Sequence, residues 1–197
     1  MALTSTRLSA ATAVSANRYV TSTNMKVGAY TLANTTPAVA GARRVTVTHT
    51  TVTGADTLGT IVVVGKNLSG QTVTDTITPL AGTIATGVVW FASITSVTGV
   101  GWVINTGNDT IVVGHDTAAV IAQGGGIIAK VIVNTTAAAT ITIADSTGTL
   151  AVLKSSIAEG AYEYDLAWSG YLAVTVAGAS DVTITHTSTI PTSYALV

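Results

Sequence analysis

In the stretch RRVTVTHT, residues Arg43–Thr50, apolar and polar side chains alternate along the chain. Successive side chains of a β-strand point to opposite faces, so Val45 and Val47 share one face while the three threonines share the other. This pattern predicts a strand with one buried and one solvent-facing side. Thr and Val also favour such pleated surfaces over helices.

The same alternation continues along the chain. Gln71–Thr78 places four threonines opposite Val73, Asp75 and Ile77. Ile61–Val64 is apolar on both faces, which predicts a central strand. Residues that favour turns separate these runs. A second block of alternating runs predicts six further strands: Ile127–Val133, Ala139–Ala144, Leu150–Leu153, Ala161–Leu166, Tyr171–Val176 and Asp181–His186.

Charged residues are scarce in this chain. Hydrophobic residues make up 48% of its 197 residues and charged residues only 9%, whereas an ordinary soluble domain has about 25% charged residues. The formal net charge is −1, although a lone monomer usually keeps its net charge away from zero. We interpret this composition as that of a subunit buried in an assembly.

The composition also argues against several kinds of partner. Phosphate binding needs clustered Lys or Arg, and only Arg43 and Arg44 are adjacent, so we expect no nucleic acid partner. No stretch reaches 18 uninterrupted apolar residues, so we expect no membrane span. Cysteine is absent, which leaves no disulfide, thiolate metal site or cysteine nucleophile.

The predicted fold class is all-β, with two small antiparallel β-sandwich domains of jelly-roll or Ig-like type and an extended N-terminal arm. Residues 1–16 weakly resemble a signal peptide, but polar residues interrupt the apolar run, so we prefer an arm that is mobile or bound to a partner. Gly124–Gly126 is interpreted as a hinge that begins the second domain. The predicted limits are 1–23 for the arm, 24–116 and 117–190 for the domains, and 191–197 for a C-terminal tail.

Few residues could carry catalysis or hold a metal. The nearest constellation is Asp109 with His115 and Asp116, to which Asn108 and Asp56 could add oxygen ligands. Its spacing fits no recognised metal loop, and a polar turn followed by a strand cap explains the same residues. No Gly-x-Ser-x-Gly motif surrounds any serine. We therefore expect no enzyme activity and no cofactor, with a metal at this constellation as the alternative.

Aromatic side chains raise the alternative of a carbohydrate-binding module. Aromatic residues at strand spacing more often pack in a core than bind sugars. Trp168 is the exception, because Trp168-Ser169-Gly170 is typical of a turn that would expose the indole. Trp168 is therefore a candidate interaction residue.

The edge strands of the predicted sheets are prone to aggregation. Neutral, Thr-rich edge strands tend to aggregate when uncovered, and this chain has few Lys or Pro residues to prevent it. Neighbouring subunits that cover these edges would remove the hazard.

Two stretches resemble segments of virion structural proteins of tailed bacteriophages. The first is Gly65–Thr78, GKNLSGQTVTDTIT, followed by Gly82-Thr83 and then by Phe91–Thr98. It is similar to a pattern in which a strand ends at Gly, a polar turn and a Thr-rich strand follow, and a "Phe … Val-Thr" strand returns. The second covers Gly160–Leu166, Gly170–Val176 and Ser180–Ile184, and it resembles small β-modules of the same class.

The resemblance implies a virion component, and a capsid decoration or cement protein fits the size and the neutral, β-rich character best. It implies binding to the major capsid protein on the capsid surface and self-association, with a trimer expected at threefold positions. A tail, neck or fibre component of the same virion is the alternative. No catalytic residues are implied. The expected contacts come from the arm and the tail, and the candidate interaction residues are Arg7, Arg18, Tyr19, Trp168 and Tyr194.

Overall fold

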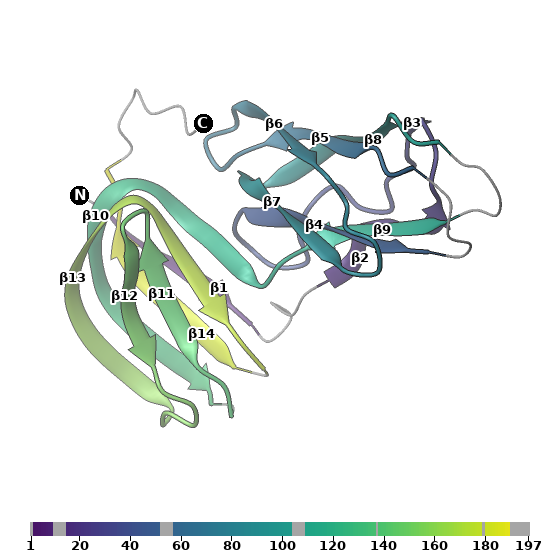
Figure 1. Cartoon of the computed structure of the whole chain (residues 1–197). Helices are drawn as coiled ribbons and strands as arrows, with labels where there is room; N and C mark the ends of the chain where they lie inside the picture. Colours follow the sequence, from purple (N-terminus) through teal and green to yellow (C-terminus); the bar gives the residue numbers. More distant parts are fainter. Residues whose placement is uncertain are drawn as a thin grey trace. The chain divides into compact units, whose positions relative to one another are not determined.

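The structure is a computed structural model that describes residues 2–9, 15–51, 57–103, 109–136, 138–178 and 180–189. These residues contain fourteen strands and no helix, which confirms the prediction of an all-β chain. The chain divides into two compact units (Figure 1). Unit 1 comprises Met1–Ala13, Ala38–Gly41 and Thr117–Val197, and unit 2 comprises Val14–Pro37 and Ala42–Asp116.

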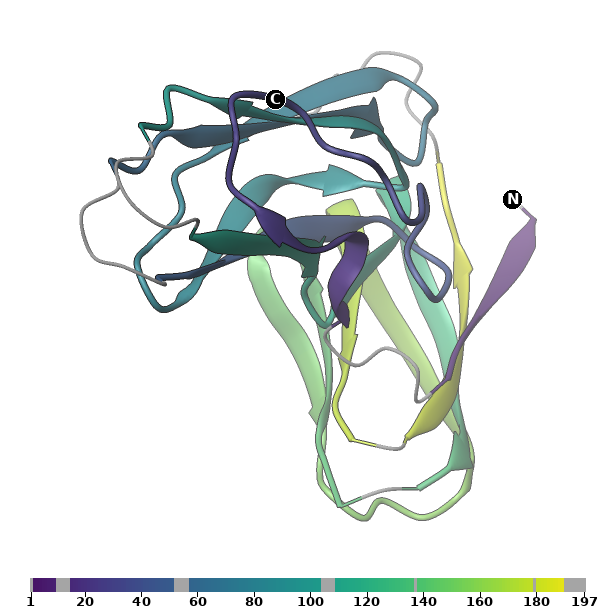
Figure 2. The same cartoon turned by 90° about the vertical axis from the view of Figure 1, so that its right-hand side faces the viewer.

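Unit 2 consists of two four-stranded antiparallel sheets that form two layers (Figure 2). Sheet 1 has the strand order β2-β9-β4-β7, and sheet 2 has the order β3-β8-β5-β6. The strands of sheet 1 are β2 (Ser15–Asn24), β9 (Thr110–His115), β4 (Arg43–Thr50) and β7 (Ile84–Phe91). Those of sheet 2 are β3 (Gly28–Ala29), β8 (Ser93–Val100), β5 (Thr60–Lys66) and β6 (Thr72–Ile77).

The core of unit 2 lies between these two sheets. Val45 and Val47 of β4 are fully buried in it, as the alternation predicts. β5 lies between β8 and β6, which confirms the prediction of a central strand. Thr46 is buried as well, although the pattern predicts that it faces solvent. The inward face of β4 thus follows the period of the sequence, and Thr46 on its other face departs from the prediction.

One carboxylate ties the two sheets of unit 2 together. Asp75 of β6 accepts hydrogen bonds from the backbone N–H groups of Val88 (2.8 Å) and Val89 (3.1 Å) in β7. The pairing of β4 with β7 shifts register in this stretch, which leaves these N–H groups without a ladder partner. Asp75 therefore satisfies groups that the β-bulge frees.

Unit 1 is built on a single six-stranded antiparallel sheet with the order β1-β14-β10-β13-β11-β12. Two of its strands are unusually long, β10 (Ala118–Thr135) and β13 (Gly160–Val176). Both curve over the unit (Figure 1), and side chains from all six strands share one core. The other strands are β1 (Leu3–Leu8), β14 (Asp181–Thr187), β11 (Ile141–Asp145) and β12 (Gly148–Leu153).

The long strands β10 and β13 correct two predictions. Gly124–Gly126, predicted as a hinge between domains, lies inside β10 and pairs with Trp168–Gly170 of β13. The predicted turn at Trp168–Gly170 is likewise wrong, because β13 runs without interruption through it. Gly124 and Gly170 both have positive φ, so each strand changes direction there and pairing with the neighbouring strand continues.

Asp145 holds β13 at this point. At the end of β11 its carboxylate accepts hydrogen bonds from the backbone N–H of Thr147 (2.7 Å) and of Ser169 (2.9 Å). Burial raises the pKa of the Asp145 carboxyl, but these hydrogen bonds outweigh burial and hold that pKa below its ordinary value. The β11–β12 turn is thereby fixed to the middle of β13.

The predicted arm over residues 1–23 contains β1 and most of β2. β1 pairs with β14 in unit 1, and β2 pairs with β9 in unit 2, so neither strand is a free arm. The alternation of the sequence in this interval was too short to distinguish a paired strand from an extended arm. The predicted tail, 191–197, lies outside the described residues.

Candidate functional site

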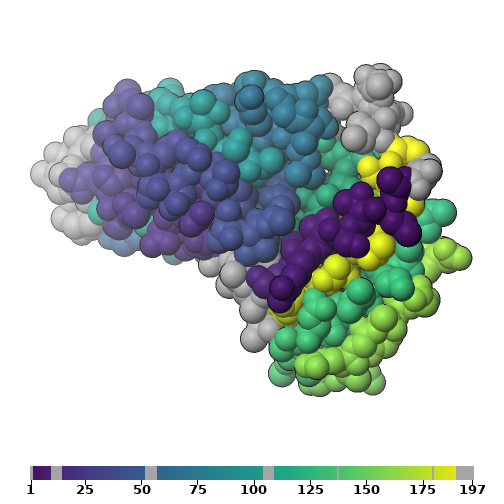
Figure 3. Space-filling view, turned by 180° about the vertical axis from the view of Figure 1, so that it is seen from behind, coloured from purple at the N-terminus to yellow at the C-terminus, as the bar shows by residue number. Residues whose placement is uncertain are grey.

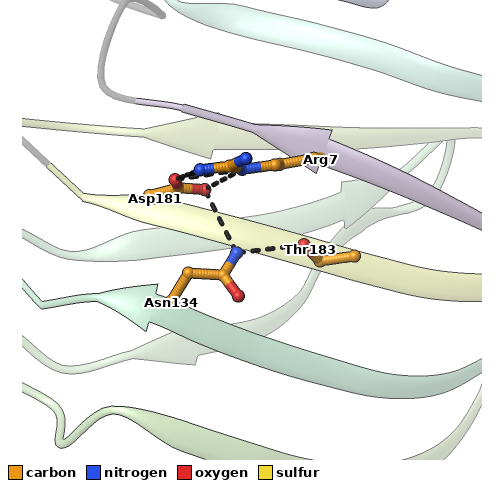
Figure 4. A network of polar contacts seen from close by, with 4 residues as sticks. All are labelled: Arg7, Asn134, Asp181 and Thr183. Atoms are coloured by element: carbon orange, nitrogen blue, oxygen red, sulfur yellow. Dashed lines mark hydrogen bonds and ion pairs between the residues drawn. The ribbon is translucent and has the colours of Figure 1, made fainter.

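Among the predicted interaction residues, Arg7 forms an ion pair with a neighbouring strand. It lies on β1, and its guanidinium forms an ion pair with Asp181 of β14, with Nε 3.1 Å from each carboxylate oxygen. The Asn134 side chain of β10 donates to Asp181 (3.1 Å) and to the Thr183 hydroxyl (3.0 Å). This network joins three neighbouring strands at one edge of unit 1 (Figure 4).

The network leaves a cation partly open to solvent. The Arg7 side chain is 68% exposed, whereas the Asp181 side chain is 11% exposed. Arg7 lowers the pKa of the Asp181 carboxyl through its hydrogen bond, burial opposes this shift, and Asn134 adds to it. Asp181 thus stays ionised at neutral pH and fixes the position of Arg7.

The remaining predicted interaction residues have different environments. Arg18 is half-buried and donates from Nε to the backbone oxygen of Thr36 at 2.9 Å. Tyr19 is fully buried, so its side chain presents no surface to a partner, contrary to the prediction. Both Tyr19 and its neighbour Val20 pack in the core of unit 2, where the pairing of β2 with β9 shifts register. Tyr194 lies outside the described residues.

The prediction that Trp168 is exposed is wrong. The residue is 4% exposed and packs edge-on against His186, with ring centroids 6.2 Å apart. Because β13 continues through the predicted turn, strand alternation directs the indole into the core of unit 1. Trp168 therefore offers no stacking surface for a sugar, and the carbohydrate-binding alternative loses the residue on which it depended.

A cluster of titratable side chains surrounds Tyr19 in unit 2. Arg43 is fully buried and donates from Nη1 to the backbone oxygen of Asp116 at 3.2 Å. The Tyr19 and His115 rings lie 6.0 Å apart. Arg44 donates from Nε to the Asp116 carboxylate at 2.8 Å and lies 5.1 Å from the Trp90 ring centre.

Burial governs the electrostatics of this cluster. It raises the pKa of Tyr19 and lowers the pKa of His115, which keeps both groups neutral at pH 7. Burial also raises the pKa of Asp116, although the hydrogen bond from Arg44 opposes this shift. The mutual contacts of these groups support a structural role for them in unit 2.

The metal constellation considered as an alternative does not assemble from its described residues. Asp109 directly precedes β9 and His115 ends it, so the two are six residues apart along an extended chain, a separation of about 20 Å. No group of three or more potential ligands occurs among the described residues. Asn108 and Asp56 lie outside those residues.

Asp109 has a partner that the sequence did not indicate. Its carboxylate lies 2.8 Å from Nε2 of His49 on β4, and both side chains are buried. The residues are 60 positions apart, and only the register of β4 beside β9 brings them together. The pair joins two strands of sheet 1 below the surface.

The outward face of sheet 2 consists mostly of uncharged side chains, with Lys66 opposite Thr72 at one end. On β6 it carries Thr72, Thr74 and Thr76, which are exposed. Strand register places Val62 beside Thr76 and Thr98, and Val64 beside Thr74 and Ser96. We call this set of residues the Thr/Val face: Thr72, Thr74, Thr76, Val62, Val64, Ser96 and Thr98.

No family model, curated protein or solved structure matches the chain. A search of the described residues for an apolar helix long enough to cross a membrane found none.

Proposed function

We propose that this chain is a structural protein of a tailed-bacteriophage virion that binds the outside of the capsid and stabilises it. The Thr/Val face carries the proposal, because it is a sheet surface of uncharged side chains on unit 2. Covering this set costs little desolvation, since its side chains carry no charge, and the exposed Lys66 opposite Thr72 can keep its ammonium in water at the end of β5. The resemblance to phage virion proteins supports this class of partner.

The proposed partners are the major capsid protein and further copies of this chain, with a trimer as the expected oligomer. A specific interface buries about 1,600 Å² in total, and its repetition over a shell multiplies a modest affinity. The effect is mechanical, because each added contact between neighbouring capsid subunits opposes their separation under internal pressure. No step of this function requires a catalytic residue or a cofactor.

We further propose that unit 2 and unit 1 are each a β-sandwich domain of Ig-like or jelly-roll type; the predicted limits 24–116 and 117–190 leave out β1 and most of β2, which the units include. Two four-stranded sheets that enclose one core support a sandwich in unit 2. The bent six-stranded sheet of unit 1 supports a sandwich that closes on itself. The edge position of β1 replaces the predicted free arm as the feature that distinguishes the N-terminal segment.

Locating the chain in purified particles tests the proposal. Gold-labelled antibodies against the chain, or a particle reconstruction, are expected to place it on the capsid surface. A position on the tail, neck or fibre would replace the decoration function by the alternative virion role. Absence of the chain from the particles would overturn both.

Charge placed on the Thr/Val face tests the surface. Val64→Lys and Thr74→Lys alter neighbouring positions of the face, and we expect each to weaken co-sedimentation with capsids about tenfold or more, which corresponds to about 1.4 kcal/mol. Val152→Lys is the matched control, because Val152 is also exposed but lies on β12 of unit 1. Equal binding of all three variants would exclude this face as the contact.

A further inference from the structure

β1 is an edge strand that belongs to unit 1 although the chain that follows it enters unit 2. It occupies one end of the six-stranded sheet and pairs only with β14 among the named strands. The rest of unit 1, apart from Ala38–Gly41, begins at Thr117. The chain on the C-terminal side of β1 does not continue into the sheet of unit 1, so β1 is held in that sheet by its pairing with β14.

Most side chains of β1 lie at the surface. Leu8 is its only buried residue, and it enters the core of unit 1. The Ser5 hydroxyl lies 3.0 Å from that of Thr185, and Arg7 pairs with Asp181. Figure 3 shows β1 (purple) lying along β14 (yellow) on the outside of the unit.

The surface that receives β1 is specific for that sequence. Asp181 is oriented by Asn134 so that it meets a cation at the position of Arg7. The core beneath has a place for Leu8, and β14 offers a backbone edge in register with Leu3–Leu8 over six residues. The segment known to satisfy all three requirements is β1, and every further copy of the chain carries it.

We propose that β1 is an exchangeable strand, so that in assemblies β1 of one copy pairs with β14 of a second copy in the same register. The contacts made in exchange are identical to those within one chain, so exchange requires that the six-residue pairing with β14 open, that Leu8 leave the core, and that copies be concentrated. This inference deepens the self-association part of the proposed function by naming the segment and its acceptor. It involves no capsid, so its test is independent of capsid binding.

Complementary charge reversal tests the exchange. Arg7→Asp places two carboxylates in the pair, and Asp181→Arg places two guanidiniums there, so each variant disfavours its own β1–β14 contact. When the two variants exchange strands with each other, both contacts regain opposite charges. We expect native mass spectrometry of an equimolar mixture, refolded together, to show mixed oligomers well above the statistical fraction. A purely statistical mixture or monomers alone would overturn the proposal.

Disulfide trapping provides a second measurement that does not depend on the ion pair. The chain has no cysteine, and Ser5 and Thr185 are register partners with side chains in contact. Single Ser5→Cys and Thr185→Cys variants, refolded together and oxidised, are expected to give a disulfide-linked dimer on a non-reducing gel. The fraction linked should fall on dilution before oxidation.

The control for trapping is a pair within unit 1 that does not involve β1. Thr142 of β11 and Thr175 of β13 are also register partners, and the mixed Thr142→Cys and Thr175→Cys variants are expected to stay unlinked. The double variant Ser5→Cys/Thr185→Cys separates the two outcomes in one chain. Linked oligomers support exchange, whereas intrachain bonds alone at every concentration overturn it. Circular dichroism melts of each variant confirm that it folds.

Discussion

Gly124 of β10 and Gly170 of β13 lie directly opposite each other in register, and both have positive φ, 105° and 73°. Paired strands therefore change direction at the same point. This juxtaposition allows one continuous sheet to curve around a single core in unit 1. The same glycine-rich sequence, taken alone, is typical of a linker.

Replacing Gly124 tests the bend. Gly124→Ala is expected to lower the free energy of unfolding of unit 1 by about 1–2 kcal/mol, because positive φ is unfavourable for a residue with a Cβ. Gly125→Ala is the comparison, since Gly125 has no positive φ; its added Cβ would meet the Trp168 backbone oxygen tightly, at 3.3 Å, so it should also lose some stability but less than Gly124→Ala. Urea unfolding followed by Trp168 fluorescence, with Trp90 and Trp102 replaced by Phe, measures both. Equal losses would contradict a special role for the bend.

Removing the carboxylate of Asp75 tests the link between the sheets of unit 2. Asp75→Ala should lower the free energy of unfolding of unit 2 by about 2 kcal/mol, because two backbone N–H groups lose their acceptor. Thr74→Ala, on the exposed side of the same strand, should change it by less than about 0.5 kcal/mol. Thermal melts that follow Trp90 and Trp102 distinguish the two. A comparable effect of both substitutions would argue against the link.

A charge in the core of unit 1 should prevent that unit from folding. Val174 is 1% exposed, and Val174→Asp buries a carboxylate without a counter-ion at a cost of about 3–5 kcal/mol. Val152→Asp is the control, because Val152 is 58% exposed. Limited proteolysis should cut the first variant within residues 117–189 and leave the second intact. Resistance of both variants would contradict the assigned core.

Unit 1 should become less stable as the pH falls from 7 to 5. Burial lowers the pKa of His186, and a backbone hydrogen bond opposes this shift in part. The unfolded chain therefore binds the proton first, near pH 6.5, and the free energy of unfolding falls below that pH by at most about 1.4 kcal/mol per pH unit for this group.

Replacing His186 isolates its contribution. His186→Leu should remove the loss between pH 7 and pH 5, because a leucine at this buried position takes up no proton. Asp181 and Asp145 have lowered pKa values, so they act only below about pH 4. Urea titrations at several pH values, with Trp168 as the reporter, measure the effect. If the variant kept the same pH dependence, the loss of stability between pH 7 and pH 5 would come from another group.

The local pattern of the sequence predicted much of the secondary structure. The predicted strand Arg43–Thr50 has the same limits as β4, and the predicted strand Asp181–His186 lies within β14. The alternation in these segments reports which side chains face inward, and burial of those side chains is the main stabilising contribution in either unit. Val45, Val47 and Val174 are buried for this reason.

The candidate site was less accessible to sequence reasoning. Arg7 could be named from the sequence, but Asp181, its partner, is 174 residues away. Trp168 was misplaced because Ser-Gly after an aromatic residue suits both a turn and a bent strand, and the choice depends on whether β10 lies alongside. The pair of His49 and Asp109 had no local signal at all.

The sequence by itself therefore determined that the chain is all-β and, in strands such as β4, which face enters the core, because both follow from the two-residue period of a strand. Only the tertiary structure decided which strands pair. It placed β1 beside β14, joined two predicted strands into β13 and buried Trp168. Pairing depends on register and on packing between residues far apart in the chain, which a local period does not encode.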